Sequence, residues 1–331
     1  MTKTPLPSGR RRFFMQKILK DIDKFGNERP WKEKKIANLT YAEYLRVLAF
    51  KKAHNVKECG NILTFRKTAE RSSQGHLKLY QTWFCHGRLC PMCNWRRRIK
   101  QSSELKQILS EAVKKEPKGR FIFLTLTEKN ADSKDLKQAL REMTKAFTKL
   151  VNYKKVKQNL LGYVRSTEIT VNDERDDYHQ HMHAILFVKA SYFKGIGYIS
   201  QKEWIRLYQR ARKLDYAPSV RVEVIKPNKE KGKNSLVASA YETAKYQVKD
   251  SDVITGETGR DLKVVEVLEN ALKGTRAIAF GGLLKKIRHE LGFDSKEKEE
   301  DLINADETTG ETAVDEVIAK WDNVRKNYFW I

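Results

Sequence analysis

The sequence predicts an α+β protein built around an antiparallel sheet with flanking helices. Three observations support this fold class. From residue 120, apolar strand-like segments and amphipathic helix-like segments follow the order strand, helix, strand, strand, helix, strand. The segment FIFLTLT at 121–127 is apolar at nearly every position, which is typical of a strand buried on both faces. A charged turn at 172–178 separates two strand-like segments and therefore indicates a hairpin.

The N-terminal part is expected to be basic and to contain short elements. Residues 1–30 indicate a basic arm with an amphipathic segment at 13–25. A helix is expected over 41–53 because Thr40 suits the N-cap position. The other elements expected before residue 120 are two short strands and a helix with a basic start, at 62–65, 77–84 and 96–113.

The elements expected after residue 120 form the core. The strands are predicted at 121–127, 162–171, 179–188 and 220–225. The helices are predicted at 133–151, 200–213 and 235–249, and a Lys- and Gly-containing loop at 227–234. Ser200 and Glu203 form a capping box before the second helix. This order is the ferredoxin-like split βαβ arrangement, in which the first and third strands are central and adjacent. The strand at 179–188 would then lie in mid-sheet.

The charge of the chain favours a polyanionic partner. Its 331 residues contain 66 Lys and Arg against 42 Asp and Glu, a net charge of +24. Residues 294–331 hold 11 acidic and 5 basic residues, so this acidic tail is −6 and the rest of the chain is +30. A basic body of this kind gains affinity for DNA or RNA by counterion release. The expected division has four parts: a basic DNA-binding segment with the cysteines at 1–119, the sheet-containing core at 120–250, a helical region at 251–293 and the tail at 294–331.

Composition also excludes several classes. Forty per cent apolar residues exclude a disordered tail protein. No apolar run approaches the ~18 residues of a membrane span, and the N-terminus lacks the apolar stretch of a signal peptide. The sequence therefore indicates a cytoplasmic protein without a membrane partner.

Three alternating histidines identify a candidate metal site. His179, His181 and His183 point to one face if the segment is a strand. The hairpin turn centre near 174–175 sets Glu168 across from His181 on the same face, although a register shift of one residue would break this pairing. Two imidazoles and a carboxylate suit Mn²⁺ or Mg²⁺ acting as a Lewis acid. His179 is the alternative third ligand, and three histidines with purely structural hydrogen bonds are the alternative to a metal.

The segment YETAKYQVK at 241–249 carries a candidate nucleophile. On a helix, Glu242 and Tyr246 lie on one face at i and i+4, with Lys245 and Lys249 beside them. Cleavage of a phosphodiester by tyrosine needs an ionisable phenol and a cation near the non-bridging oxygens. Tyr241 lies on another face and is the weaker candidate. The alternative is a surface helix with an ordinary charged face.

The cysteines indicate a structural zinc site. Cys85, Cys90 and Cys93 fall within nine positions, and Cys59 is available as the fourth ligand, with His86 as its alternative. Four thiolates in tetrahedral array favour Zn²⁺. The basic run of Arg96, Arg97 and Arg98 follows immediately, so the expected task of the metal is to brace a DNA-binding module. Four reduced thiols without a metal are the alternative.

Three motifs together carry a resemblance to a known family. FIFLTLT, HQHMHAILFV and YETAKYQVKDSD, in this order, resemble the motifs of rolling-circle plasmid replication initiators of the HUH endonuclease superfamily. Within this superfamily the chain is similar to the Gram-positive plasmid group with one active tyrosine and a nearby glutamate. The resemblance extends over roughly residues 40–292 and includes the cysteines and FGGLLKKIRHEL.

The resemblance implies roles for individual residues. His181 and His183 would bind the metal, Tyr246 would be the nucleophile, Glu242 would assist termination and Lys249 would steady the scissile phosphate. It implies a strand-specific nick at a hairpin origin, with a 5′-phosphotyrosine and a 3′-OH primer. The implied partners are origin DNA, a host DNA polymerase and a host superfamily 1 helicase, and a homodimer stays open.

Three other functions remain open from the sequence. A relaxase or single-strand transposase would share the nicking chemistry. A non-enzymatic, zinc-containing DNA-binding regulator would explain the charge and the cysteines, but not the histidine strand. A basic RNA-binding protein is the third.

Overall fold

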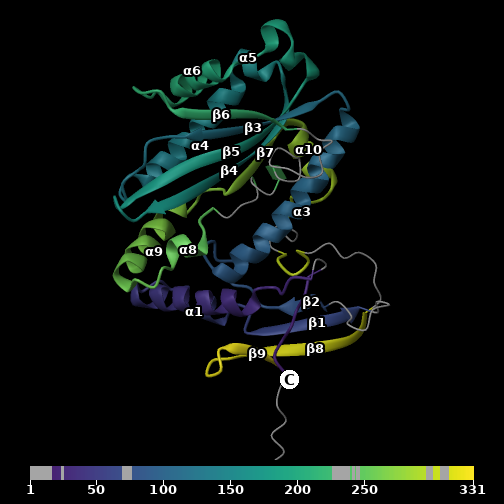
Figure 1. Ribbon diagram of the computed structural model, residues 1–331, viewed down its shortest axis with the longest axis vertical. Helices are drawn as coiled ribbons and strands as arrows, with labels where there is room; N and C mark the ends of the chain where they lie inside the picture. Colours follow the sequence, from purple (N-terminus) through teal and green to yellow (C-terminus); the bar gives the residue numbers. More distant parts are fainter. Residues whose placement is uncertain are drawn as a thin grey trace, which may run out of the picture. The chain divides into compact units, whose positions relative to one another are not determined.

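The computed structural model of the chain describes residues 17–23, 26–68, 77–225, 239–240, 243, 247–295, 301–305 and 313–331 (Figure 1). The chain divides into two compact units. The first unit comprises Met1–Lys32, Gly60–Trp83 and Thr308–Ile331, and the second comprises Glu33–Cys59 and Phe84–Glu307. This grouping differs from the expected boundaries after residues 119, 250 and 293, because segments distant in sequence pair within one sheet.

The first unit is built on a four-stranded antiparallel sheet in the order β2-β1-β8-β9. Its strands are β1 Ile62–Thr68, β2 Leu77–Thr82, β8 Ala313–Asp322 and β9 Asn327–Trp330. Phe65 is fully buried and contacts the rings of Trp31 and Trp330 edge-on, with ring centroids 5.9 and 6.1 Å apart. The aromatic side chains on one face thus provide the core of this small unit.

The C-terminal part of the acidic tail expected at 294–331 contains the strands β8 and β9. In β8, buried Ala319 and Trp321 alternate with exposed Ile318 and Lys320, which is the period of a strand with one buried face. The strand pairs along its length with β1. Net charge alone did not reveal this pairing, because the acidic residues of the strand are exposed or half-buried and only its apolar residues face the core.

The second unit begins with three helices, α1 Trp31–Val47 (whose first two residues belong to the first unit), α2 Ala53–Glu58 and α3 Pro91–Lys115. The expected helix at 41–53 is corrected at both ends. Thr40 is not an N-cap: it lies inside α1, where its hydroxyl donates to the Ile36 carbonyl at 3.3 Å. The helix ends before Ala49, whose φ of 57° is left-handed.

The core of the second unit is a five-stranded antiparallel sheet in the order β6-β3-β5-β4-β7. The strands are β3 Arg120–Thr127, β4 Leu160–Asn172, β5 Asp177–Val188, β6 Ser219–Ile225 and β7 Ile278–Gly281. The first and third strands of the predicted series, β3 and β5, are adjacent, and the histidine strand β5 lies in the middle of the sheet, as expected. The edge strand β7 was not predicted, because its four residues lie in a region expected to be helical.

Helices cover both faces of this sheet (Figure 1). On one face, α4 Leu136–Asn152 and α6 Gln201–Arg212 bury Phe147 and Trp204 against the strands, and the short α5 Lys154–Lys157 follows α4. On the other face, α3 and α10 Gly282–Glu290 cover Phe121 and Phe187, whose rings stack 4.4 Å apart. The described residues also form the 3₁₀ turns Ala190–Phe193 and Gly195–Gly197 and the helices α8 Asp250–Val253 and α9 Thr258–Leu272.

Only one of the two hydrogen bonds of the capping box predicted before α6 forms. The Ser200 hydroxyl accepts the Glu203 N–H at 3.3 Å, but the Glu203 carboxylate pairs with Lys155 at 2.7 Å instead of returning to the cap. The helix expected at 235–249 and the loop at 227–234 lie mostly or wholly outside the described residues. Within the described part of the chain, no helix is long and apolar enough to cross a membrane.

Candidate functional site

The β4–β5 hairpin brings one carboxylate and two imidazoles together. Asn172 pairs with Asp177 across the turn, and this register sets Glu168 directly opposite His181, as predicted. A Glu168 carboxylate oxygen lies 3.1 Å from Nε2 of His181 and 3.2 Å from Nε2 of His183. One ligand atom from each of these three side chains lies within 4.8 Å of the others. The donor set of two nitrogens and one carboxylate oxygen therefore fits a divalent cation such as Mn²⁺ or Mg²⁺.

The electrostatics of this cluster favour an ionised carboxylate. Burial opposes ionisation of Glu168, but the hydrogen bonds from His181 and His183 outweigh it and hold the pKa of Glu168 well below its usual range. The Thr125 hydroxyl lies 3.3 Å from Nδ1 of His183, which fixes the orientation of this ring. Nδ1 of His181 is buried without a hydrogen-bond partner. The cluster is thus held together mainly by the contacts of the two imidazoles with the Glu168 carboxylate.

His179 does not join the described cluster. Its ring centroid lies 5.3 Å from that of His181, and the ring is half-buried. His179 is nearer the hairpin turn, at the start of β5. Burial and then the neighbouring His181 lower the pKa of His179. Of the two third ligands considered from the sequence, Glu168 is the one that the fold brings to the pair.

Of the tyrosine segment at 241–249, the structure describes Thr243 and residues 247–249. Tyr241, Glu242, Lys245 and Tyr246 lie outside the described residues. Gln247 follows Tyr246 in the sequence, and its backbone carbonyl accepts the N–H of Ile169 at 2.8 Å. Ile169 is the residue after Glu168 on β4. The carbonyl of Val248 accepts from the side-chain amide of Asn94 on α3 at 3.3 Å. Lys249 is exposed and is the N-cap of α8.

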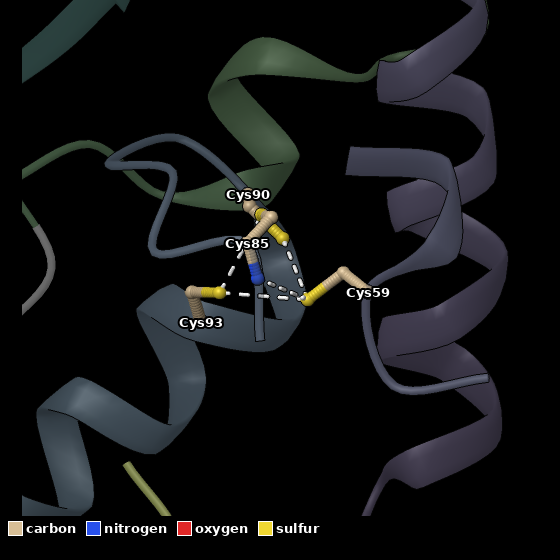
Figure 2. Close-up of side chains that lie close together, drawn as sticks. All are labelled: Cys59, Cys85, Cys90 and Cys93. Carbon is tan, nitrogen blue, oxygen red and sulfur yellow. Dashed lines mark hydrogen bonds between the residues drawn. The ribbon is translucent and has the colours of Figure 1, made fainter. Parts of the chain in front are cut away.

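The four cysteines converge on one point (Figure 2). The sulfur of Cys59 lies 3.5 Å from that of Cys93 and 3.7 Å from that of Cys90, and the sulfurs of Cys85 and Cys93 are 3.6 Å apart. A tetrahedral Zn²⁺ with bonds of about 2.3 Å needs sulfurs about 3.8 Å apart. A disulfide needs about 2.05 Å. The spacing therefore fits a four-thiolate metal site and no disulfide.

Groups around the sulfurs also suit a metal site. The backbone N–H of Gly87 donates to the Cys85 sulfur at 3.4 Å, and the Asn38 amide donates to the Cys90 sulfur at 3.3 Å. Mutual hydrogen bonding lowers the pKa of the Cys85 thiol and raises that of Cys59. His86, the alternative ligand, is exposed and outside the cluster.

Lys35 was missed by the sequence analysis. Its fully buried ammonium donates to the carbonyls of Lys57 and Cys59 at 2.7 and 2.8 Å, and burial lowers its pKa to about 8 although the cysteine sulfurs act in the opposite direction. A cation here would offset part of the negative charge of four thiolates and one zinc ion. A lysine within the helical segment WKEKK gives no sequence signal for this role.

The basic run after the cysteines divides into structural and surface residues. Arg96, predicted to bind DNA, is fully buried, and its guanidinium donates to the carbonyls of Leu302 and Ile303 at 3.0 and 2.8 Å. This prediction is corrected, because a phosphate cannot reach a guanidinium enclosed in this way. Arg97 and Arg98 are half-buried and line a groove beside α3.

Comparison with known proteins assigns the chain to a class. A family model described as "Replication protein" matches residues 76–329. A protein named "Protein rep" from Lactiplantibacillus plantarum is 56% identical over 321 residues, which cover 95% of this chain and 99% of the relative. Its counterpart from Lentilactobacillus hilgardii is 55% identical over 315 residues, with the same two coverages. A "Protein rep" from Streptococcus pneumoniae is 39% identical over 317 residues and 95% of each chain. No solved structure matches.

The chain is thus a replication protein. It belongs to the Rep family of Gram-positive plasmid replication initiators, and the resemblance drawn from the three motifs is confirmed.

Proposed function

We propose that this Rep protein is an HUH endonuclease that nicks one strand of its plasmid origin. The observation that carries the proposal is the convergence of Glu168, His181 and His183 on the central strands, beside Gln247, the residue that follows Tyr246. The strand order β6-β3-β5-β4 agrees with a ferredoxin-like sheet, to which β7 adds an edge. DNA synthesis needs a primer with a free 3′-OH, and a nick in the origin supplies one.

In the proposed reaction, the phenolic oxygen of Tyr246 attacks the scissile phosphorus. The phenol loses its proton as the new bond forms, the bond from phosphorus to the 3′ oxygen breaks, and the 3′ oxygen takes up a proton and leaves as the 3′-OH. The 5′ phosphate stays on Tyr246 as a phosphodiester, so no oxidant or nucleotide cofactor is needed. Mn²⁺ or Mg²⁺ held by the three ligands would supply Lewis-acid polarisation of the phosphate. Lys249, exposed at the start of α8, would steady a non-bridging oxygen.

Glu242 would act at the end of the round. A carboxylate four residues before Tyr246 in the sequence is suited to take a proton from a water molecule. The resulting hydroxide attacks the phosphotyrosine, the bond from phosphorus to the tyrosine oxygen breaks, and the protein is released. The free 3′-OH would meanwhile serve a host DNA polymerase, and a host superfamily 1 helicase would unwind from the nick. These partners are those that the family resemblance implies.

We also propose that Cys59, Cys85, Cys90 and Cys93 hold a structural Zn²⁺. All four sulfurs are supplied by protein, so no position is left for a substrate. Cys90 is the N-cap of α3 and Cys93 lies in its first turn, so a metal there would fix the start of this helix. Arg97 and Arg98 follow one turn later on α3 and would thereby be held in position for DNA.

A strand-nicking assay tests the proposal. A labelled single-stranded origin oligonucleotide is incubated with Mn²⁺ or EDTA and resolved on a denaturing gel. We expect metal-dependent cleavage that is abolished in Tyr246→Phe and reduced at least 100-fold in His183→Ala. His179→Ala is the matched control on the same strand and keeps the activity.

The same assay separates the other functions. A DNA-binding regulator would bind the oligonucleotide in a salt-dependent way and never cut it with any metal. Retained cleavage with slowed release of protein in Glu242→Ala would assign this residue to termination. A relaxase or transposase would cut without a need for this glutamate at any stage.

A further inference from the structure

A basic groove of about 460 Å³ lies in the second unit, along α3, β7 and α10. Seven of its 17 lining residues are Lys or Arg, and one, Glu104, is acidic. The cations come from three separate segments: the loop after Cys85, the first turns of α3 and residues 276–288. Because distant segments contribute the same charge, the groove concentrates positive potential at one place on the surface.

Seven basic side chains against one carboxylate leave the groove with a surplus of positive charge. The guanidinium of Arg88 donates to the carbonyls of Leu272 and Thr275, whereas the ammonium of Lys100 donates to the carbonyl of Asp301 and lies 3.8 Å from the Glu104 carboxylate. The carbonyl oxygens orient Arg88 but do not neutralise it. Burial, and then the neighbouring Arg97, lower the pKa of Arg88, so that like charges face one another here. Such a cluster favours an anionic ligand.

One wall of the groove is apolar. It contains Ile278 and Phe280 from the edge strand β7, both half-buried. The guanidinium of Arg288 lies over the Phe280 ring, 5.1 Å from its centroid. An aromatic ring beside several cations is the combination by which proteins hold single-stranded nucleic acid, since bases stack on rings while phosphates pair with cations.

The groove reaches the candidate active site. Its lining includes Gln247, which is hydrogen-bonded to β4 next to Glu168, and Asn94, which holds the carbonyl of Val248. A strand lying in the groove would therefore pass the residues directly after Tyr246. This continuity identifies the ligand as DNA that enters or leaves the site of the nick, in preference to an unrelated anion.

We propose that this groove is a subsite for the backbone of the single strand on one side of the scissile phosphate, held by Arg97, Arg276 and Lys285 and stacked on Phe280. The inference rests on the proposed nicking function, because the groove continues outward from the candidate active site. None of these four residues was assigned to the active site, and three of them lie outside the basic run found in the sequence.

Two adjacent lysines of α10 provide a matched test. Lys285 and Lys286 are both exposed, but only Lys285 lines the groove. The variants Lys285→Gln and Arg97→Gln, their double variant and the control Lys286→Gln are made in the full chain carrying Tyr246→Phe. Affinity for a fluorescent single-stranded origin oligonucleotide is measured from low to high salt, and repeated with the oligonucleotide shortened from either end.

We expect the double variant to bind about tenfold more weakly, and its salt slope to fall by about 0.7 for each phosphate that no longer pairs with a cation. Lys286→Gln should stay within twofold of its parent. Shortening the DNA on one side should weaken the parent and have little effect on the double variant. Equal affinity and slope in the parent and the double variant would overturn the subsite. Tyr246→Phe binds without cutting, so this result is independent of whether the nicking reaction itself is confirmed.

Discussion

The cysteine cluster gives the sharpest prediction on stability, through the variant Cys90→Ser. The four sulfurs are already spaced for a tetrahedral zinc ion, and Cys90 is fully buried. Loss of a group that only supports a metal ligand costs 10- to 100-fold in affinity, about 1.4–2.7 kcal/mol, and loss of a ligand itself costs at least this much. At about 2–4 °C per kcal/mol, the melting temperature should fall by about 3–11 °C or more.

The assay combines metal content with thermal unfolding. Purified wild type should contain one zinc ion per chain, and Cys90→Ser should contain less and melt earlier. His86→Asn is the matched control in the same loop, because His86 has a left-handed φ of 54° that asparagine tolerates. A metal-free wild type with four reactive thiols and the same melting temperature as Cys90→Ser would refute the reasoning.

The remaining predictions concern three buried charged groups. Asp261 is fully buried and accepts hydrogen bonds from Tyr44, Thr255, Gly256 and Arg260. Burial opposes its ionisation, but these donors hold its pKa below the usual value. Its contribution to the free energy of unfolding is thus present above pH ~4 and lost as the pH falls through the lower folded pKa. Chemical denaturation of Asp261→Ala should show a loss of about 3–5 kcal/mol at pH 7 that shrinks in acid. Glu168→Gln should weaken Mn²⁺ binding at least 10-fold in calorimetry, against no change in His179→Ala. Arg96→Gln should lower the free energy of unfolding by about 1–3 kcal/mol and leave the salt slope of DNA binding unchanged. A reduced slope would show that Arg96 contacts DNA as the sequence predicted.

The candidate metal site was predictable because strand geometry has a strict period. Once the turn centre near 174–175 is known, alternation fixes both the face of the histidines and the partner of His181. The position of β5 in mid-sheet followed from the order of the elements alone. The cysteine cluster was likewise visible, since three of its members are close in sequence.

Other features could not be predicted from local patterns. The pairing of β1 with β8 joins segments more than 200 residues apart, and no local period reveals such a partner. In the run of three arginines, charge alone does not tell which side chain faces inward, and the carbonyls that hold Arg96 belong to residues 302 and 303. The groove cations Arg276 and Lys285 become neighbours of α3 only through the tertiary fold.

The central claim is that Tyr246 takes the 5′ phosphate of the nicked strand. The most direct measurement traps the covalent product on a single-stranded origin oligonucleotide with Mn²⁺ and maps the modified peptide by mass spectrometry. The account predicts a phosphodiester on Tyr246, joined to the 5′ end of the cleaved strand, and no adduct in Tyr246→Phe. Tyr241→Phe should react as wild type does. An adduct on Tyr241, or cleavage that leaves no covalent protein on either fragment, would contradict the account.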